Sequence, residues 1–282
     1  MTKTEFDILT KIKENKQYEA DYMARILYKP LEAIENAYSE LIRQGYILNG
    51  SLTQAGDSLL NTHRIDNAVI LSAGMSTRFV PLNFEIPKGL LTVKGEPLIE
   101  RQICQLREKG IEEIIIVVGY MKEQFEYLVG KYGVILVETD EYETKNNHAS
   151  IWAARQYLKN TIITSSDLYF DENLFETYAY DSFYCTVYVS GKTAERGIET
   201  DDDDRILTTM YGDKCYDIWV TLGYAFFSSG FSSNMINILD KIYDLPETAN
   251  KFWADIQDDY LNELYMYAKR CDAEIIHEFD SL

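Results

Sequence analysis

The segment AVILSAGMSTRF, residues 68–79, joins a short apolar run to a turn of small residues. The apolar run predicts a buried strand, and the turn behind it contains Gly74. Small residues allow backbone N–H groups to point at a phosphate chain without obstruction by side chains. Arg78 ends the turn, and Lys88 follows Pro87 a short loop later. Because positive charge stabilises a phosphorus centre that loses an anionic leaving group, we expect Arg78 and Lys88 to be catalytic.

The turn itself, residues 72–78, is the expected phosphate-binding element of the chain (the phosphate turn). Neither G-x-G-x-x-G nor G-K-S/T occurs in it, which disfavours a Rossmann dinucleotide loop and a Walker loop. A plain strand-to-helix turn with a surface arginine and lysine remains the alternative. The residues expected to contact a nucleotide here are Ser72, Ala73, Gly74, Met75 and Ser76.

Strand and helix patterns alternate from Asp66 onward. Short apolar runs predict strands at 68–71, 113–118, 134–138 and 161–164. Amphipathic patterns predict helices at 98–109, 122–131 and 150–158. This alternation predicts an α/β fold with a doubly wound, mostly parallel sheet. In such sheets ligands bind beyond the carboxyl ends of the strands, where the turn after residue 71 lies.

Residues 1–64 have a different character and form a predicted domain of their own, followed by a second domain at 65–282. Three helical patterns precede a hairpin through Asn49-Gly50, a dipeptide typical of a primed turn. This order, and the sequence LTQAGDSLL at 52–60, resemble the winged-helix family. The resemblance implies a small winged-helix domain in front of the α/β domain.

The charge of the chain argues against DNA as a partner. The formal net charge is −19, and the third predicted helix carries Glu32, Glu35 and Glu40 but no Lys or Arg before Arg43. Such a helix would be repelled by a phosphate backbone. We therefore expect the N-terminal domain to serve docking, homodimer formation or regulation rather than DNA recognition.

A specific family resemblance begins at the phosphate turn. The turn and the later Pro87-Lys88 pair resemble the A-G-x-G-x-R and P-K signature of sugar-nucleotide and choline-phosphate nucleotidyltransferases. Ser76 stands where that family usually has a second glycine. The resemblance runs from about Asp66 to Leu282. It implies transfer of a nucleotidyl group to an acceptor with release of pyrophosphate.

Two further segments carry the resemblance. VVGY at 117–120 resembles the base-contacting turn of the family, and TKNNHAS at 144–150 resembles the T-N-N-x-x-S segment of the choline-phosphate cytidylyltransferase branch. Lys145 departs from that pattern, which has threonine there. A loop with a helix cap is the structural alternative for the two asparagines. The nucleotide contacts implied are Gly119, Tyr120, Asn146, Asn147 and Ser150.

Carboxylates at two places suggest a magnesium site. Asp167 directly follows the strand predicted at 161–165, beside the phosphate turn, and Mg²⁺ binds oxygen ligands while bridging phosphates. The family places its metal aspartate at this position. The segment FWADI, 252–256, resembles the W-E-D stretch of the family, which makes Asp255 the second expected ligand. The other aspartates that stay open for this role are Asp217, Asp258 and Asp259.

The acceptor is expected to be cationic. The tail resembles the choline-phosphate branch more than the hexose-phosphate branch, and an ammonium group binds to aromatic faces. Trp152, Phe226 and Trp253 are the aromatic residues expected to bind it. The resemblance implies CTP and phosphocholine, then a related phospho- or phosphono-amine, then a sugar 1-phosphate. A nucleotide-sensing transcription regulator and a nucleotide-binding scaffold, both without turnover, stay open.

The cysteines and the apolar segments of the sequence indicate the expected cellular compartment. The cysteines Cys104, Cys185, Cys215 and Cys271 are widely spaced, which disfavours zinc and favours reduced thiols. The apolar runs are too short for a membrane span, and the N-terminal residues lack the apolar core of a secretion signal. We therefore expect a cytoplasmic protein.

Overall fold

The computed structural model describes residues 1–15, 18–27, 29–75 and 85–279. The chain divides into two compact units: Met1–Arg64 with Tyr178–Tyr180, and Ile65–Thr177 with Asp181–Leu282. Two of the expected site residues, Ser76 and Arg78, lie outside the described residues.

The smaller unit is built from short helices and a hairpin around a core of aliphatic side chains. It contains the helices α1 (Lys3–Asn15), α2 (Ala20–Ile26), α3 (Leu31–Arg43) and α4 (Gln54–Asn61), and the strands β1 (Ile47–Leu48) and β2 (Ser51–Leu52). Ile8, Ile34 and Leu41 are fully buried at its centre. Helix α4 was not predicted. It begins after Thr53, whose hydroxyl oxygen accepts the Gly56 N–H at 3.1 Å. This N-cap provides a partner for a backbone N–H of the first turn.

The larger unit is organised around one sheet. Its strands are β3 (Asn67–Ser72), β6 (Glu113–Val118), β7 (Ile135–Glu138), β8 (Thr161–Ser165), β10 (Phe183–Lys192), β11 (Gly197–Thr200), β12 (Ile206–Met210), β13 (Tyr216–Phe227) and β14 (Tyr267–Arg270). The spatial order is β12–β11–β13–β8–β3–β6–β7, with β10 beside β13 and β14 beside β10. Strands β8, β3, β6 and β7 are parallel, whereas β13 and β10 add an antiparallel part.

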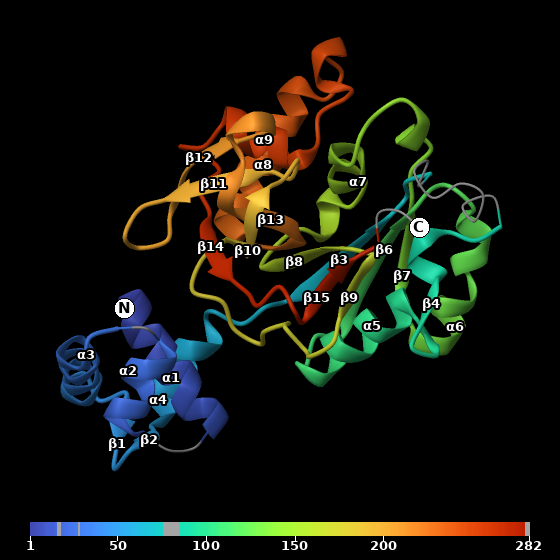
Figure 1. The fold of residues 1–282 in the computed structure, drawn as a ribbon. Coiled ribbons are helices and arrows are strands. Elements are labelled where there is room, and N and C mark those ends of the chain that lie inside the picture. The colour runs from blue at the N-terminus through green and yellow to red at the C-terminus, as the bar shows by residue number, and fades with distance from the viewer. Residues whose placement is uncertain (16–17, 28, 76–84, 280–282) are drawn as a thin grey trace. The chain divides into compact units, whose positions relative to one another are not determined.

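Helices cover both faces of this sheet (Figure 1). They are α5 (Leu98–Glu108), α6 (Tyr127–Tyr132), α7 (His148–Ala153), α8 (Ser229–Ile242) and α9 (Trp253–Asp259). Because side chains alternate along a strand, Val69 and Leu71 of β3 pack with α7, α8 and α9, through residues such as Ile151, Met235 and Ile256. The α/β fold with a mostly parallel central sheet is confirmed.

Short elements complete the unit. The 3₁₀ turns are η3 (Lys88–Leu90), η4 (Lys122–Phe125), η5 (Glu141–Glu143), η6 (Arg155–Tyr157), η7 (Gly212–Lys214) and η8 (Pro246–Thr248). The short strands are β4 (Thr92–Val93), β5 (Glu96–Pro97), β9 (Leu168–Phe170) and β15 (Ile276–Glu278). The helix predicted at 122–131 is thus split into η4 and α6, and the helix predicted at 150–158 is split into α7 and η6.

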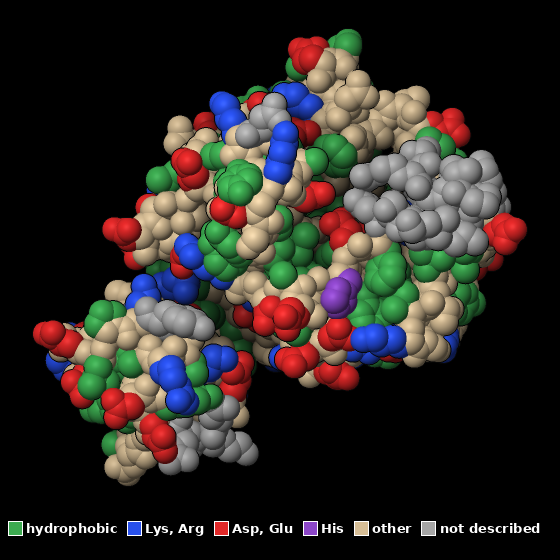
Figure 2. All heavy atoms as spheres, viewed as in Figure 1, with side chains coloured by type: hydrophobic (Ala, Val, Ile, Leu, Met, Phe, Trp, Pro, Cys, Tyr) green, Lys and Arg blue, Asp and Glu red, His purple; other side chains and the backbone are tan. Residues whose placement is uncertain are grey.

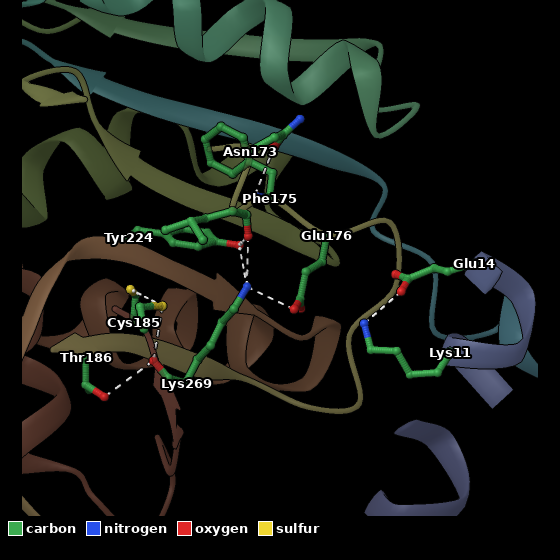
Figure 3. A network of polar contacts seen from close by, with 11 residues as sticks. Lys11, Glu14, Asn173, Phe175, Glu176, Cys185, Thr186, Tyr224 and Lys269 are labelled. Atoms are coloured by element: carbon green, nitrogen blue, oxygen red, sulfur yellow. Dashed lines mark hydrogen bonds and ion pairs between the residues drawn. The ribbon is translucent and has the colours of Figure 1, made fainter. Parts of the chain in front are cut away.

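Figure 3 shows polar contacts around β10 and β14. Lys269 of β14 donates from Nζ to the Leu174 carbonyl oxygen and pairs with Glu176, both at 2.9 Å. Burial alone would lower the pKa of Lys269, but the charge of Glu176 raises it above its ordinary value, so the ammonium form persists. Beside it, the thiol sulfurs of Cys185 and Cys271 lie 2.9 Å apart. These contacts join β10 and β14 to the segment that follows β9.

On the face drawn in Figure 2, Lys and Arg side chains are interspersed with Asp and Glu rather than gathered in one basic patch. This pattern agrees with the formal net charge of −19. Within the described ranges, no helix has the length and apolar character needed to cross a bilayer.

Candidate active site

A cavity of about 500 Å³ opens at the carboxyl ends of β3 and β8 in the larger unit. One wall of the cavity is formed by the phosphate turn, by η3 and by the residues after β8. The opposite walls come from the loop before α7, from the antiparallel part of the sheet and from the start of α9. The cavity therefore lies where doubly wound sheets bind ligands.

The phosphate turn forms one edge of the cavity. Ser72, Ala73 and Gly74 line it. Gly89 of η3 packs so closely against the strand ends that a Cβ there would lie 2.8 Å from the Ser166 Cβ and 3.1 Å from the Ser72 Oγ. This close approach brings η3 against β3 and β8. Met75 is described but does not line the cavity, whereas Ser76 and Arg78 fall in the part of the chain without a description.

Lys88 and Asp167 face each other inside this cavity. The Lys88 Nζ lies 3.3 Å from the Asp167 Oδ2, and the two side chains are 10% and 18% exposed. Asp167 lies two residues after the end of β8, and its carbonyl oxygen accepts the Phe279 N–H at 3.1 Å. The structure thus brings together the glycine-bearing turn after β3, an ammonium group and a carboxylate, the last two of which are 79 residues apart in the chain.

The loop before α7 supplies the opposite wall. Asn146, Asn147 and Ser150 line the cavity. The Asn147 Oδ1 also accepts the Trp253 N–H at 2.8 Å, and the Asn146 Nδ2 donates to the Asn250 carbonyl oxygen at 3.2 Å. The two asparagines therefore tie this loop to the segment that leads into α9. They contribute polar atoms to the cavity wall at the same time.

Gly119 and Tyr120 lie behind the phosphate turn rather than on the cavity surface. The Tyr120 N–H donates to the Ala73 carbonyl oxygen at 3.1 Å. A Cβ on Gly119 would lie 2.5 Å from the Tyr142 ring and 2.9 Å from the same carbonyl oxygen. Their contact with the cavity is therefore indirect, through the position of the turn.

Lys145 and His148 are held by partners around this loop. The Lys145 Nζ lies 2.8 Å from the Glu141 Oε1 and 3.4 Å above the centre of the Tyr243 ring. The His148 Nδ1 lies 2.7 Å from the Lys251 carbonyl oxygen, and burial lowers the pKa of His148. His148 is therefore a neutral, structural neighbour of the cavity, whereas Lys145 is part of its lining.

The far end of the cavity combines aromatic rings with charges. The residues that line it are Tyr184, Glu195, Arg196, Tyr211 and Phe252. Glu278 also lines the cavity, from the strand that pairs beside Asp167. Arg196 is 6% exposed, and its guanidinium pairs with Asp258 and donates to the Gln257 Oε1 at 2.6 Å. It also lies 5.3 Å from the centre of the Tyr184 ring.

Comparison with known proteins shows the family of this chain. The model of the MobA-like NTP transferase domain matches residues 68–189. The choline-phosphate cytidylyltransferase of Streptococcus pneumoniae is 36% identical over 215 residues, which cover 76% of this chain and 93% of that protein. The 2-aminoethylphosphonate cytidylyltransferase of Lancefieldella rimae is 36% identical over 220 residues, which cover 77% of this chain and 89% of that protein.

This chain belongs to the cytidylyltransferase family. The solved structure of CTP:phosphocholine cytidylyltransferase from Streptococcus pneumoniae matches it with a TM-score of 0.74 at 35% identity, covering 78% of this chain and 95% of that chain. The cytidylyltransferase is thus a nucleotidyltransferase, an enzyme that acts on a nucleoside triphosphate and a phosphorylated acceptor.

The aromatic residues expected to bind the acceptor do not line the cavity of this cytidylyltransferase. Trp253 is 4% exposed and stacks on Tyr184 with 4.8 Å between ring centres. Phe226 is 2% exposed and packs against Phe183, and Trp152 stacks on Tyr243. These side chains pack against other aromatic rings, because burying a large aromatic ring is more favourable than exposing it in a water-filled cavity.

The structure also does not bring Asp255 to the cavity lining. Its Oδ2 accepts the Phe252 N–H at 2.7 Å, and its Oδ1 accepts the Tyr211 hydroxyl at 3.0 Å. Asp255 thus caps the start of α9. The alternative aspartates have partners of their own: Asp217 accepts the Gly191 N–H, Asp258 pairs with Arg196, and Asp259 pairs with Lys251.

The sequence did not predict the five residues at the far end of the cavity, or Glu278, as part of the site. For Phe252 a signal is present, since it is the first residue of the FWADI segment, next to the predicted Trp253. Glu278 reaches the cavity because β15 pairs with β9, which places Glu278 opposite Leu168, the residue after Asp167. That antiparallel pairing joins residues more than 100 positions apart, and no local pattern indicates it.

Proposed function

We propose that this chain is a Mg²⁺-dependent cytidylyltransferase that joins CTP to phosphocholine, or to a related phospho- or phosphono-amine. The products are a CDP-linked compound and pyrophosphate. The observation that carries the proposal is the pair formed by Lys88 and Asp167, 3.3 Å apart in the cavity beside Gly74. A phosphate turn, a cation and a carboxylate are the groups that transfer of a nucleotidyl group requires.

The donor set of the cavity is suited to magnesium. Among the described residues, no group of three or more His, Cys, Asp or Glu side chains could hold a metal alone. Mg²⁺ binds through one or two carboxylates, several waters and the phosphates of its substrate, so it needs no such cage. Asp167 is the proposed ligand, and Glu278 is a second carboxylate of the same cavity. When bound, the ion would neutralise charge on the triphosphate.

The chain's own residues act mainly by position and charge. An acceptor phosphate or phosphonate oxygen is ionised near neutral pH, so attack on the α-phosphorus requires no general base. Lys88 stabilises the negative charge that accumulates on the phosphate oxygens and on the departing pyrophosphate. Arg78 keeps the same proposed role, outside the described residues.

The far end of the cavity supports a cationic acceptor. Tyr211 and Phe252 are each 50% exposed and line the cavity, which leaves aromatic faces available to an ammonium group. Glu195 adds negative charge there, and Arg196 is already paired with Asp258. The two relatives that are 36% identical are named for phosphocholine and for 2-aminoethylphosphonate, and both compounds carry a cationic nitrogen.

A pyrophosphate-release screen tests the proposal. CTP, UTP, GTP and ATP are each combined with phosphocholine, 2-aminoethylphosphonate or a hexose 1-phosphate. We expect release with CTP and an amine-bearing acceptor only. Release with the hexose 1-phosphate alone would instead identify a sugar-1-phosphate nucleotidyltransferase. Nucleotide binding without any release would identify a sensor or a scaffold, and would refute the proposed reaction.

We further propose that the smaller unit is a winged-helix-like module for docking, for homodimer formation or for regulation. Its helices α1 to α3 precede the β1–β2 hairpin, the order typical of that family. The side chains of Glu32, Glu35 and Glu40 on α3 oppose a role in reading DNA.

A further inference from the structure

We propose that Asp255 is a positioning residue, which holds Tyr211 at the acceptor end of the cavity and thereby sets the affinity for the acceptor. This inference rests on the proposed function, because it concerns the acceptor of the same reaction. It replaces the role in metal binding that the sequence suggested for Asp255.

The two carboxylate oxygens of Asp255 are divided between two segments. The Oδ2 accepts the N–H of Phe252 at 2.7 Å, which fixes the first turn of α9. The Oδ1 accepts the hydroxyl of Tyr211 at 3.0 Å, across 44 positions of sequence. A single side chain therefore connects the loop after β12 with the start of α9. The two aromatic residues that it joins, Tyr211 and Phe252, both line the cavity.

Tyr211 depends on such a contact to keep one orientation. It follows the last residue of β12 and precedes Gly212, whose φ of 72° marks a turn. Its side chain is 50% exposed, so packing restrains it only in part. Burial of the hydroxyl region and the charge of Asp255 raise the pKa of Tyr211, which keeps the hydroxyl protonated as a donor. A ring held in its bound orientation before the acceptor arrives lowers the entropy cost of binding.

The same geometry disfavours Asp255 as a metal ligand. Both of its oxygens accept hydrogen bonds from Phe252 and Tyr211, and the residue does not line the cavity. Asp167, by contrast, lines the cavity. Binding of a metal by Asp255 would require loss of the helix cap or of the tyrosine contact.

Four variants separate positioning from metal binding. Asp255→Ala removes both contacts, and Tyr211→Phe removes only the hydroxyl. Asp255→Asn can keep both contacts, because the amide oxygen can accept the Phe252 N–H while the amide nitrogen donates to the Tyr211 oxygen. Asp259→Asn is the matched control, since Asp259 ends the same helix and pairs with Lys251 on the surface.

The first measurement is the steady-state kinetics of the full chain with CTP, phosphocholine and Mg²⁺. We expect Asp255→Ala and Tyr211→Phe to raise KM for phosphocholine roughly tenfold, the effect of one hydrogen bond to a charged group, with kcat and KM for CTP little changed. The double variant should be no worse than Asp255→Ala alone. Asp255→Asn and Asp259→Asn should stay near wild type.

The opposite pattern would overturn the inference. If Asp255→Asn is as damaging as Asp255→Ala and both need more Mg²⁺ for half-maximal rate, Asp255 binds the metal. If the effects of Asp255→Ala and Tyr211→Phe multiply, the two residues act independently.

Thermal unfolding separates a failure of this inference from a failure of the proposed function. If the wild-type protein forms no product with any acceptor, the proposed function is refuted. The hydrogen bond between Tyr211 and Asp255 is then tested by measuring Tm. Tyr211→Phe should lower Tm in the wild-type background but not in the Asp255→Ala background. Equal lowering in both backgrounds would contradict the contact.

Discussion

Lys88 and Asp167 are neighbours of opposite charge in a sheltered part of the cavity, with 3.3 Å between the Nζ and Oδ2 atoms. Each partly neutralises the other while no ligand is bound. In the proposed reaction, a triphosphate with its metal would offer both groups a new partner, since phosphate oxygens attract an ammonium group and a cation attracts a carboxylate. The pair is therefore suited to bind both components together.

Replacement of either member should abolish most turnover and leave the fold in place. We expect Lys88→Ala and Asp167→Ala each to lower kcat by about 10²–10³-fold, the usual cost of losing one group that stabilises transition-state charge. Steady-state kinetics and far-UV circular dichroism measure the two effects. Lys94→Ala is the matched control, because Lys94 pairs with Asp171 but its side chain is 62% exposed. Near-wild-type turnover in either cavity variant would refute the assignment.

His148 should make the stability of the protein depend on pH. Burial lowers the pKa of His148, so the folded state favours the neutral ring, whereas the unfolded chain titrates near an ordinary value of about 6.5. Below that pH the unfolded state binds the proton first, and the free energy of unfolding decreases. In urea unfolding at about pH 7.5 and about pH 5.5, wild type should lose more stability than His148→Asn. Equal losses in the two proteins would exclude this role.

At the scale of elements, the 3₁₀ turn η3 determines where Lys88 lies. Gly89 lets η3 pack against the ends of β3 and β8, because any larger residue would meet Ser166 and Ser72. Gly89→Ala should cost about 1–3 kcal/mol in the free energy of unfolding and lower kcat by about tenfold or more, since Lys88 must shift.

Gly130 provides the matched control for that substitution. It lies inside α6, and an added Cβ would meet nothing within 4 Å. Gly130→Ala should leave kcat unchanged and raise the free energy of unfolding by up to about 1 kcal/mol. Chemical denaturation and steady-state kinetics compare both variants. A Gly89→Ala protein as active and as stable as Gly130→Ala would show that the close packing of η3 has no functional role.

The elements that sequence predicts well are those with a local signal. The apolar runs of β3, β6, β7 and β8 lie within a residue or two of the predicted ranges, because the strands of a parallel sheet are mostly apolar. The phosphate turn follows β3 as its small residues indicated. The antiparallel strands β10 and β13 were missed, since their pairing depends on contacts between distant segments.

In the candidate site, too, local sequence patterns predict some residues, whereas others depend on contacts between distant segments. The FWADI segment borders the cavity, but Phe252 at the N-cap of α9 lines it while Trp253 at the first helical position points into the core. One position along a helix start changes the direction of a side chain by about 100°. Glu278 was not predicted as a site residue, because its approach to Asp167 depends on the β9–β15 pairing.

At the scale of the whole molecule, the acidic charge limits the partners of the chain. With a formal net charge of −19 and glutamates along α3, the protein should bind a random DNA duplex at low salt more weakly than about 10⁻⁴ M. Fluorescence polarisation measures this, and a Glu32→Lys/Glu35→Lys variant serves as the control, since binding should strengthen as the repulsion is removed. Micromolar binding by wild type that weakens steeply with salt would contradict the proposed docking or regulatory role.

The most direct test of cytidylyl transfer is ³¹P nuclear magnetic resonance of the full chain with CTP, phosphocholine and Mg²⁺. We predict that the triphosphate signals are replaced by those of a CDP-linked diphosphate and of pyrophosphate in equal amounts, and that Asp167→Ala leaves CTP unchanged over the same time. Unchanged CTP with wild type, for phosphocholine and for 2-aminoethylphosphonate alike, would contradict the proposed reaction. Equal turnover by Asp167→Ala would show that the reaction takes place elsewhere.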